Sequence, residues 1–115
     1  MGRYNSAPQP EFTMTLTADQ RKHLRSLGHG LNPVVTVATK GLTEGVIAEI
    51  ERALSDHELI KVRLTVGDRV LKKQLIAEIC QQVKGEEVQV IGHILLLYRK
   101  ADKPNPRLSN LLRPV

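Results

Sequence analysis

The chain has 115 residues and is poor in cysteine and aromatic side chains. Cys80 is the only cysteine, which excludes a disulfide framework and a cysteine-based zinc site within the chain. Aromatic residues make up 3% of the sequence, and Tyr98 is the only one after position 13. Proteins that stack several bases on aromatic rings need a platform that this sequence cannot supply. We expect Tyr98, at the end of an apolar run, to be packed rather than stacked on a ligand.

Patterns typical of catalysis and of metal binding are also missing. The four histidines lack metal-ligand spacing, and no serine lies in a nucleophile elbow. Most of the histidines are interpreted as surface or turn residues, while His29 and His93, beside glycines, are candidates for phosphate contact. Cys80 lies among aliphatic residues and is interpreted as a small core residue. The sequence predicts no catalytic residue, no cofactor and no metal site.

No stretch is long and apolar enough to span a membrane, and no signal-peptide core is present. We therefore expect a cytoplasmic protein with no membrane partner, and the lack of an acid-base pair leads us to expect no small-molecule substrate. Lys and Arg number 17 against 12 Asp and Glu, which gives a formal charge of +5 and favours a polyanionic partner. Basic segments 14–43, 61–73 and 91–115 alternate with acidic segments 44–60 and 74–90. Such blocks either sort onto a basic and an acidic face or form a mixed solvated surface.

The hydrophobic pattern predicts three helices. Thr17 and Gln20 have the spacing of a capping box for a helix that ends near residue 27, where Gly28 and Gly30 follow. Thr43 is the predicted N-cap of a second helix with an apolar stripe on one face and carboxylates on the other. A third helix is expected from the N-cap at Asp68 to Gly85, which we expect to end it.

Short runs of β-branched or alternating apolar residues predict strands at 34–37, 59–65, 88–91 and 94–98. Gly92-His93 then forms a two-residue hairpin with glycine first, as a type II′ turn requires. Strands joined through helices favour parallel pairing, and the hairpin adds an antiparallel strand. The prediction is an α/β fold of the α+β two-layer type, with the order αβαβαββ and a four-stranded mixed sheet.

The chain divides into three parts by composition. Residues 1–13 have prolines and no periodic apolar pattern, and we interpret them as a leader outside the fold. Residues 14–100 are the predicted domain. Residues 101–115 are rich in proline and in basic residues, and we expect a flexible basic tail with little structure.

The segment from residue 36 to residue 45 reads as a strand, a short loop and a helix start. Free N–H groups at a helix N-terminus, next to a lysine and a glycine, form a site suited to phosphate. The loop is shorter than a Walker loop and is similar to the GXXG loop with which KH-type domains clamp a nucleic-acid backbone. An ordinary tight turn is the alternative. The candidate contacts here are Ala38, Thr39, Lys40, Gly41, Leu42 and Thr43.

Three separated motifs give the sequence a more specific resemblance. The motifs are Leu42-Thr43-Glu44-Gly45-Val46, His57-Glu58-Leu59-Ile60-Lys61-Val62, and Val88-Gln89-Val90-Ile91-Gly92 followed by Leu96-Leu97-Tyr98-Arg99. Together they resemble the YhbY/CRM-domain family of RNA-binding proteins over about residues 16–100. The resemblance implies a fold like the C-terminal domain of translation initiation factor three. It also implies contact with ribosomal RNA through the GXXG-like loop and association with precursors of the large ribosomal subunit.

Two positions depart from the family pattern. Ala38 stands where the family usually has the first loop glycine, so a left-handed backbone there would be unfavourable. Either this position needs no such backbone, or the loop is altered. His93 stands where a lysine usually follows Gly92, which removes a permanent charge near the hairpin.

The function predicted from the sequence is a non-catalytic RNA-binding protein that assists assembly of the large ribosomal subunit. The alternative is a module that docks on a ribosomal protein or an assembly factor, and a small enzyme acting on a phosphorylated metabolite is the least favoured class. Basic residues outside the loop are further candidate phosphate contacts, although they cannot all share one face. They are Arg21, Lys22, Arg25, Lys61, Arg63, Lys72, Lys73 and Arg99.

Overall fold

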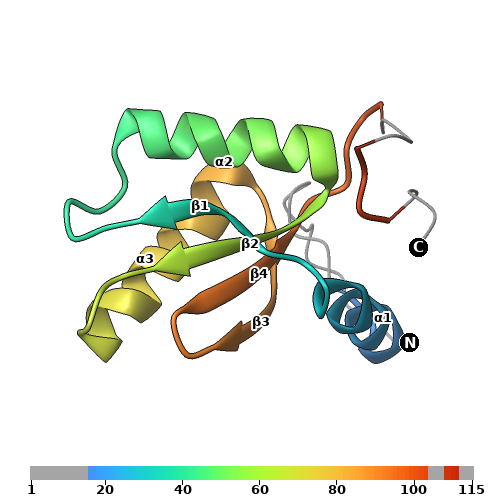
Figure 1. Ribbon diagram of the computed structural model, residues 1–115, viewed down its shortest axis with the longest axis horizontal. Coiled ribbons are helices and arrows are strands. Elements are labelled where there is room, and N and C mark those ends of the chain that lie inside the picture. The colour runs from blue at the N-terminus through green and yellow to red at the C-terminus, as the bar shows by residue number, and fades with distance from the viewer. Residues whose placement is uncertain (1–15, 104–107, 112–115) are drawn as a thin grey trace, which may run out of the picture.

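The computed structural model describes residues 16–103 and 108–111. The elements are α1 (Ala18–Gly28), β1 (Pro33–Val37), α2 (Glu44–His57), β2 (Leu59–Leu64), α3 (Arg69–Val83), β3 (Glu86–Ile91) and β4 (Ile94–Tyr98). The strands form one sheet in the order β1-β2-β4-β3, in which β1 and β2 are parallel and β4 is antiparallel to both of its neighbours (Figure 1). The predicted element order and the four-stranded mixed sheet are confirmed.

Each helix begins at the residue that the sequence predicts. The Thr17 hydroxyl accepts from the N–H of Gln20 at 3.1 Å, and the Gln20 side chain accepts from the N–H of Thr17 at 2.9 Å. The Thr43 hydroxyl caps α2, and the Asp68 carboxylate accepts from two N–H groups in the first turn of α3. These side chains satisfy donors that have no partner inside the helix, so the capping residues fix where the helices start.

The ends of the helices differ from the prediction. Helix α1 continues through Gly28, and α3 ends with Lys84 in the left-handed conformation, at φ 56°, rather than with Gly85. A Cβ atom on Gly85 would lie 3.1 Å from Cδ1 of Leu97 and 3.4 Å from the backbone oxygen of Tyr98. Glycine is therefore needed at position 85 because strand β4 passes close to it, and the reversal of the chain occurs one residue earlier.

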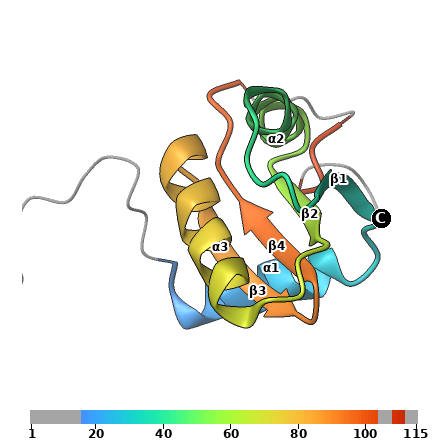
Figure 2. The same cartoon turned by 90° about the vertical axis from the view of Figure 1, so that its left-hand side faces the viewer.

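The larger core lies between the sheet and helices α2 and α3 (Figure 2). Alternation along β2 explains its composition, because Ile60, Val62 and Leu64 point to this side and are at most 1% exposed. The smaller core lies on the opposite face, where Leu24 of α1 packs with Leu59 of β2 and with residues of β3 and β4. Helix α1 thus adds a partial third layer to the predicted two-layer fold.

The described part of the C-terminal segment is packed on the end of α2. Ser109 is fully buried, and its hydroxyl donates to Oε1 of Glu58 at 2.8 Å. Oε2 of Glu58 accepts from the N–H of Ala101 at 2.9 Å, and the side chain of Asn110 donates to the backbone oxygen of Leu59. The prediction of a flexible tail is therefore wrong for residues 108–111, because the buried Glu58 carboxylate and the backbone oxygen of Leu59 supply them with partners. The predicted leader, residues 1–13, lies outside the described residues.

Replacing Ser109 with alanine should lower the free energy of unfolding by about 1–3 kcal/mol, because one oxygen of the buried Glu58 carboxylate then loses its donor. Urea denaturation followed by circular dichroism measures this difference. Ser26→Ala, on the exposed side of α1, is the control that should cause no loss. If Ser109→Ala were as stable as the wild type, the described contact of Ser109 with Glu58 would not hold residues 108–111 in place.

Candidate nucleic-acid interface

The loop between β1 and α2 is a tight turn closed by its own backbone. The N–H of Gly41 donates to the backbone oxygen of Ala38 at 2.9 Å, and Gly41 has the left-handed φ of 79°. Ala38 is not in the left-handed region, where the described non-glycine residues are Glu58 and Lys84. The turn therefore requires glycine at position 41 and accepts alanine at position 38 without backbone strain. Of the two possibilities for position 38, the structure therefore supports the one in which this position needs no left-handed backbone.

The corner is anchored on one side and open on the other. Leu42 packs against the larger core, and a Cβ atom on Gly41 would lie 4.0 Å from a methyl carbon of Leu75 in α3. Thr39 and Lys40 are exposed, and no described side chain or backbone group forms a hydrogen bond or ion pair with Lys40. The ammonium group of Lys40 is therefore available to a ligand in solution.

Backbone donors lie next to this lysine. The N–H of Val46 is taken by the Thr43 hydroxyl at 3.2 Å, whereas the N–H groups of Glu44 and Gly45 have no acceptor among the described residues. They lie at the positive end of the α2 dipole, where an anion is stabilised. The Glu44 carboxylate in the same turn supports the helix and opposes a bound phosphate. The positive charge of Lys40 is therefore needed to offset the repulsion between Glu44 and a bound anion.

The end of β2, the first turns of α3 and the turn between β3 and β4 lie at the same end of the molecule as this loop, the end that faces the viewer in Figure 2, and they carry several basic residues. Arg63 stands near the end of β2, and its strand partner Ile94 directly follows the hairpin turn. In the first turns of α3, Lys72 donates to the backbone oxygen of Gly92 at 2.8 Å and so ties the helix to that turn. A hollow of about 420 Å³ beside these turns is lined by Arg69, Lys72, Lys73, Ile76, Ala77, Glu87 and Val90.

Arg69 is not among the contacts predicted from the sequence, yet it lines the same hollow as two of them. It precedes Lys72 and Lys73 by three and four residues, a spacing that places all three side chains on neighbouring positions of one helix surface. This spacing is the signal that could have identified it.

The basic residues of α1 lie on the other side of the sheet. Arg21 donates from one terminal nitrogen to the backbone oxygens of Glu87 and Val88, so part of its guanidinium holds α1 against β3. Lys22 is exposed, and Arg25 is partly buried. The structure therefore does not bring these three residues together with the loop.

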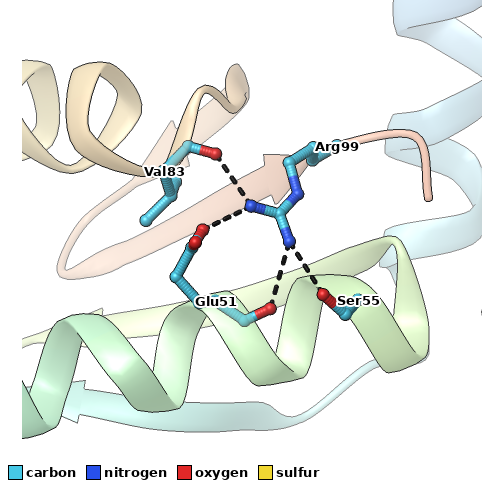
Figure 3. Close-up of polar contacts among 4 residues, drawn as sticks. All are labelled: Glu51, Ser55, Val83 and Arg99. Atoms are coloured by element: carbon cyan, nitrogen blue, oxygen red, sulfur yellow. Dashed lines mark hydrogen bonds and ion pairs between the residues drawn. The ribbon is translucent and has the colours of Figure 1, made fainter. Parts of the chain in front are cut away.

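Arg99 has partners inside the protein (Figure 3). One terminal nitrogen of its guanidinium pairs with the Glu51 carboxylate and donates to the backbone oxygen of Val83 at 2.9 Å. The other donates to the backbone oxygen of Glu51 at 3.1 Å and to the Ser55 hydroxyl at 3.0 Å. These contacts join α2, α3 and the end of β4. They give Arg99 a structural role in place of the predicted phosphate contact.

Cys80 and Tyr98 are packed, as predicted. Cys80 is partly buried against the larger core, and this burial, assisted by the charges of Glu87 and Glu86, raises the pKa of its thiol to about 11. The thiol is therefore protonated at neutral pH and is a poor nucleophile. Tyr98 belongs to the smaller core, where burial and, to a lesser degree, the charge of Glu58 raise the pKa of its phenol. Its ring offers no stacking surface.

Residues 16–103 and 108–111 contain neither a cluster of metal ligands nor a helix that could span a membrane. No group of three or more His, Cys, Asp or Glu side chains there is placed to hold a metal ion. None of the helices in this part of the chain has the length and apolar character needed to cross a membrane.

Sequence comparison adds to this geometry. The family model of the CRS1 / YhbY (CRM) domain matches residues 16–99. The chain is 53% identical over 100 residues to a Pseudomonas aeruginosa protein named "Probable RNA-binding protein", a match that covers 87% of this chain and 96% of that protein. It is 49% identical over 94 residues to a Haemophilus influenzae protein named "RNA-binding protein", covering 82% of this chain and 95% of that protein.

A solved structure has the same fold. The chain is similar to the solution structure of a hypothetical protein from Staphylococcus aureus, with a TM-score of 0.69 and 34% sequence identity. The match covers 77% of this chain and 93% of that chain.

Replacing Arg99 with glutamine should lower the free energy of unfolding by about 1 kcal/mol, because the partly exposed Glu51 carboxylate and two backbone oxygens lose a hydrogen bond from the guanidinium. Urea denaturation measures the change. Arg52→Gln, on the exposed surface of α2, removes the same charge and should have almost no effect. If both variants were equally stable, the contacts of Arg99 would contribute nothing to stability.

Proposed function

This chain belongs to the CRS1/YhbY (CRM) domain family, and we propose that it is a non-catalytic RNA-binding protein. It contacts ribosomal RNA through the loop between β1 and α2 and assists assembly of the large ribosomal subunit from its precursor. The names of the Pseudomonas aeruginosa and Haemophilus influenzae relatives, both RNA-binding proteins by name, support RNA as the partner. The ribosomal precursor is supported by the family resemblance of the sequence motifs.

The observation that carries the proposal is the open corner at Lys40. Lys40 is exposed in the loop that leads to the N–H groups of Glu44 and Gly45, which have no described acceptor, and Gly41 carries no side chain that would block approach. A ribose-phosphate chain presents anionic oxygens that these donors can bind. Contacts of this kind hold the backbone of the nucleic acid and give binding that weakens as salt increases.

The form of recognition follows from the aromatic content of the folded part. Tyr98 is the only aromatic residue of the described chain and is 9% exposed. Recognition must therefore depend on phosphate, ribose and shape, with little base stacking.

Replacing Lys40 with glutamate should weaken binding to a fragment of large-subunit ribosomal RNA by about tenfold or more, because an attractive charge becomes repulsive at the phosphate site. Fluorescence anisotropy at fixed salt measures the affinity. The melting temperature should stay unchanged because Lys40 is exposed and has no partner among the described residues. Lys100→Glu makes the same charge change at the other end of the sheet and is the control.

Unchanged RNA affinity of the Lys40→Glu protein would remove the loop from the mechanism. A second measurement addresses the subunit: tagged wild-type protein in a sucrose gradient should sediment with precursors of the large subunit, and Lys40→Glu should reduce this fraction. Binding to precursor particles without any binding to protein-free transcripts would favour the alternative, docking on a ribosomal protein.

A further inference from the structure

Most of one face of the sheet is not covered by a helix. Helix α1 packs only over the end of this face that carries Leu59, Leu96 and Tyr98. Towards the loop, the strand register places Thr36, Arg63, Ile94 and Ile91 in one row across the four strands. These residues share a face because Val37 and Leu64, their neighbours along the strands, point into the larger core.

A second row lies beside the first and runs towards α1. Lys61 is paired with Leu96, and Leu96 with Gln89. A bulge in β3 between Glu87 and Gln89 brings Val88 and Gln89 to this same side. The uncovered face therefore carries cationic, amide and aliphatic side chains next to one another.

Two adjoining hollows follow these rows and meet at Ile94. One, of about 570 Å³, is lined by Arg63, Thr65, Val66, Gly67, His93 and Ile94. The other, of about 270 Å³, is lined by Gly28, His29, Lys61, Gln89, Ile91, Ile94 and Leu96. We call the two together the open-face groove.

The open-face groove is basic and partly apolar. Its lining contains Lys61, Arg63 and two histidines, and it contains no carboxylate. Neither Lys61 nor Arg63 forms an ion pair with a described residue. Ile91 is 64% exposed at its edge, and Ile94 is partly buried at its centre. A cationic lining that has no acidic neighbour within it is complementary to a polyanion.

The open-face groove begins beside the strand that leads into the loop between β1 and α2. The N–H of Thr65, which lines the groove, donates to the backbone oxygen of Val37 at 2.9 Å, and its hydroxyl approaches the same oxygen at 3.3 Å. Val37 directly precedes Ala38, the first residue of the loop. The groove therefore starts at the end of the sheet from which the loop leaves β1.

We propose that the open-face groove binds a single-stranded RNA segment that continues from the loop, an inference that rests on the proposed function. Lys61 and Arg63 bind phosphates, and Ile91 and Ile94 contact ribose and base faces. The two cations are two residues apart on one strand, about 6.6 Å along it, a spacing comparable to one nucleotide step of an extended strand. The position of the open-face groove at the loop end of the sheet favours RNA over an acidic peptide as its occupant.

The test compares short and long RNA. The proteins are wild type, Lys61→Gln/Arg63→Gln and the control Arg52→Gln/Lys100→Gln, which removes two exposed charges outside the groove. Oligouridines of about 4 and about 12 nucleotides are used because a GXXG loop alone clamps about four nucleotides. Anisotropy is measured over a series of salt concentrations, and melting temperatures are recorded for every variant.

We expect the groove variant to lose about tenfold in affinity for the long RNA and less than twofold for the short one. The slope of log affinity against log salt should fall in magnitude by about 1.4 with the long RNA, since each phosphate contact on a single strand contributes about 0.7. The control should match the wild type. Ile91→Ser, at a highly exposed position, should weaken binding of the long RNA without changing the slope.

If the groove variant and the control had the same affinity and the same salt slope, the proposed groove would be overturned. The proposed function would still stand if Lys40→Glu weakened binding of both the short and the long RNA. If neither the groove variant nor Lys40→Glu lost affinity, both the groove and the loop would be removed from the RNA-binding mechanism. If polyglutamate competed as effectively as RNA at equal charge, the groove would be assigned to an acidic peptide. This result would also overturn the inference.

Discussion

The alternation of side chains along β2 is the constraint on which the rest of the molecule depends. Ile60, Val62 and Leu64 are buried under α2 and α3, which fixes Lys61 and Arg63 on the opposite face. A slip of one residue would bury two cations and expose the aliphatic side chains, so the register is strongly determined. Because β2 pairs with both β1 and β4, this register also fixes where the loop and the hairpin turn lie.

The two ends of the sheet are built in opposite ways. At the end where β4 finishes, Arg99 joins two helices, and the Glu58 carboxylate accepts from the backbone of Ala101 and from the Ser109 hydroxyl. Polar groups at this end are satisfied within the chain, which makes it rigid. At the other end, Lys40 and two N–H groups of α2 have no described partner. Long-range side-chain hydrogen bonds therefore gather at one end of the sheet, and donors without a described partner lie at the other.

The sequence predicts what is decided locally. The helix starts at Thr17, Thr43 and Asp68 and the alternation of the strands need only neighbouring residues, and the structure confirms them. Pairings between distant residues could not be predicted. The contact of Arg99 with Glu51 spans 48 positions, and that of Ser109 with Glu58 spans 51. For this reason Arg99 is assigned to RNA, and residues 108–111 to a flexible tail, when the sequence is considered alone.

The turn from Ala38 to Gly41 separates two requirements within one loop. Gly41 is fixed by its left-handed backbone, whereas position 38 is exposed and accepts a side chain. A substitution at position 38 would therefore change the exposed surface of the loop while its backbone conformation is preserved, at little cost to the stability of the domain.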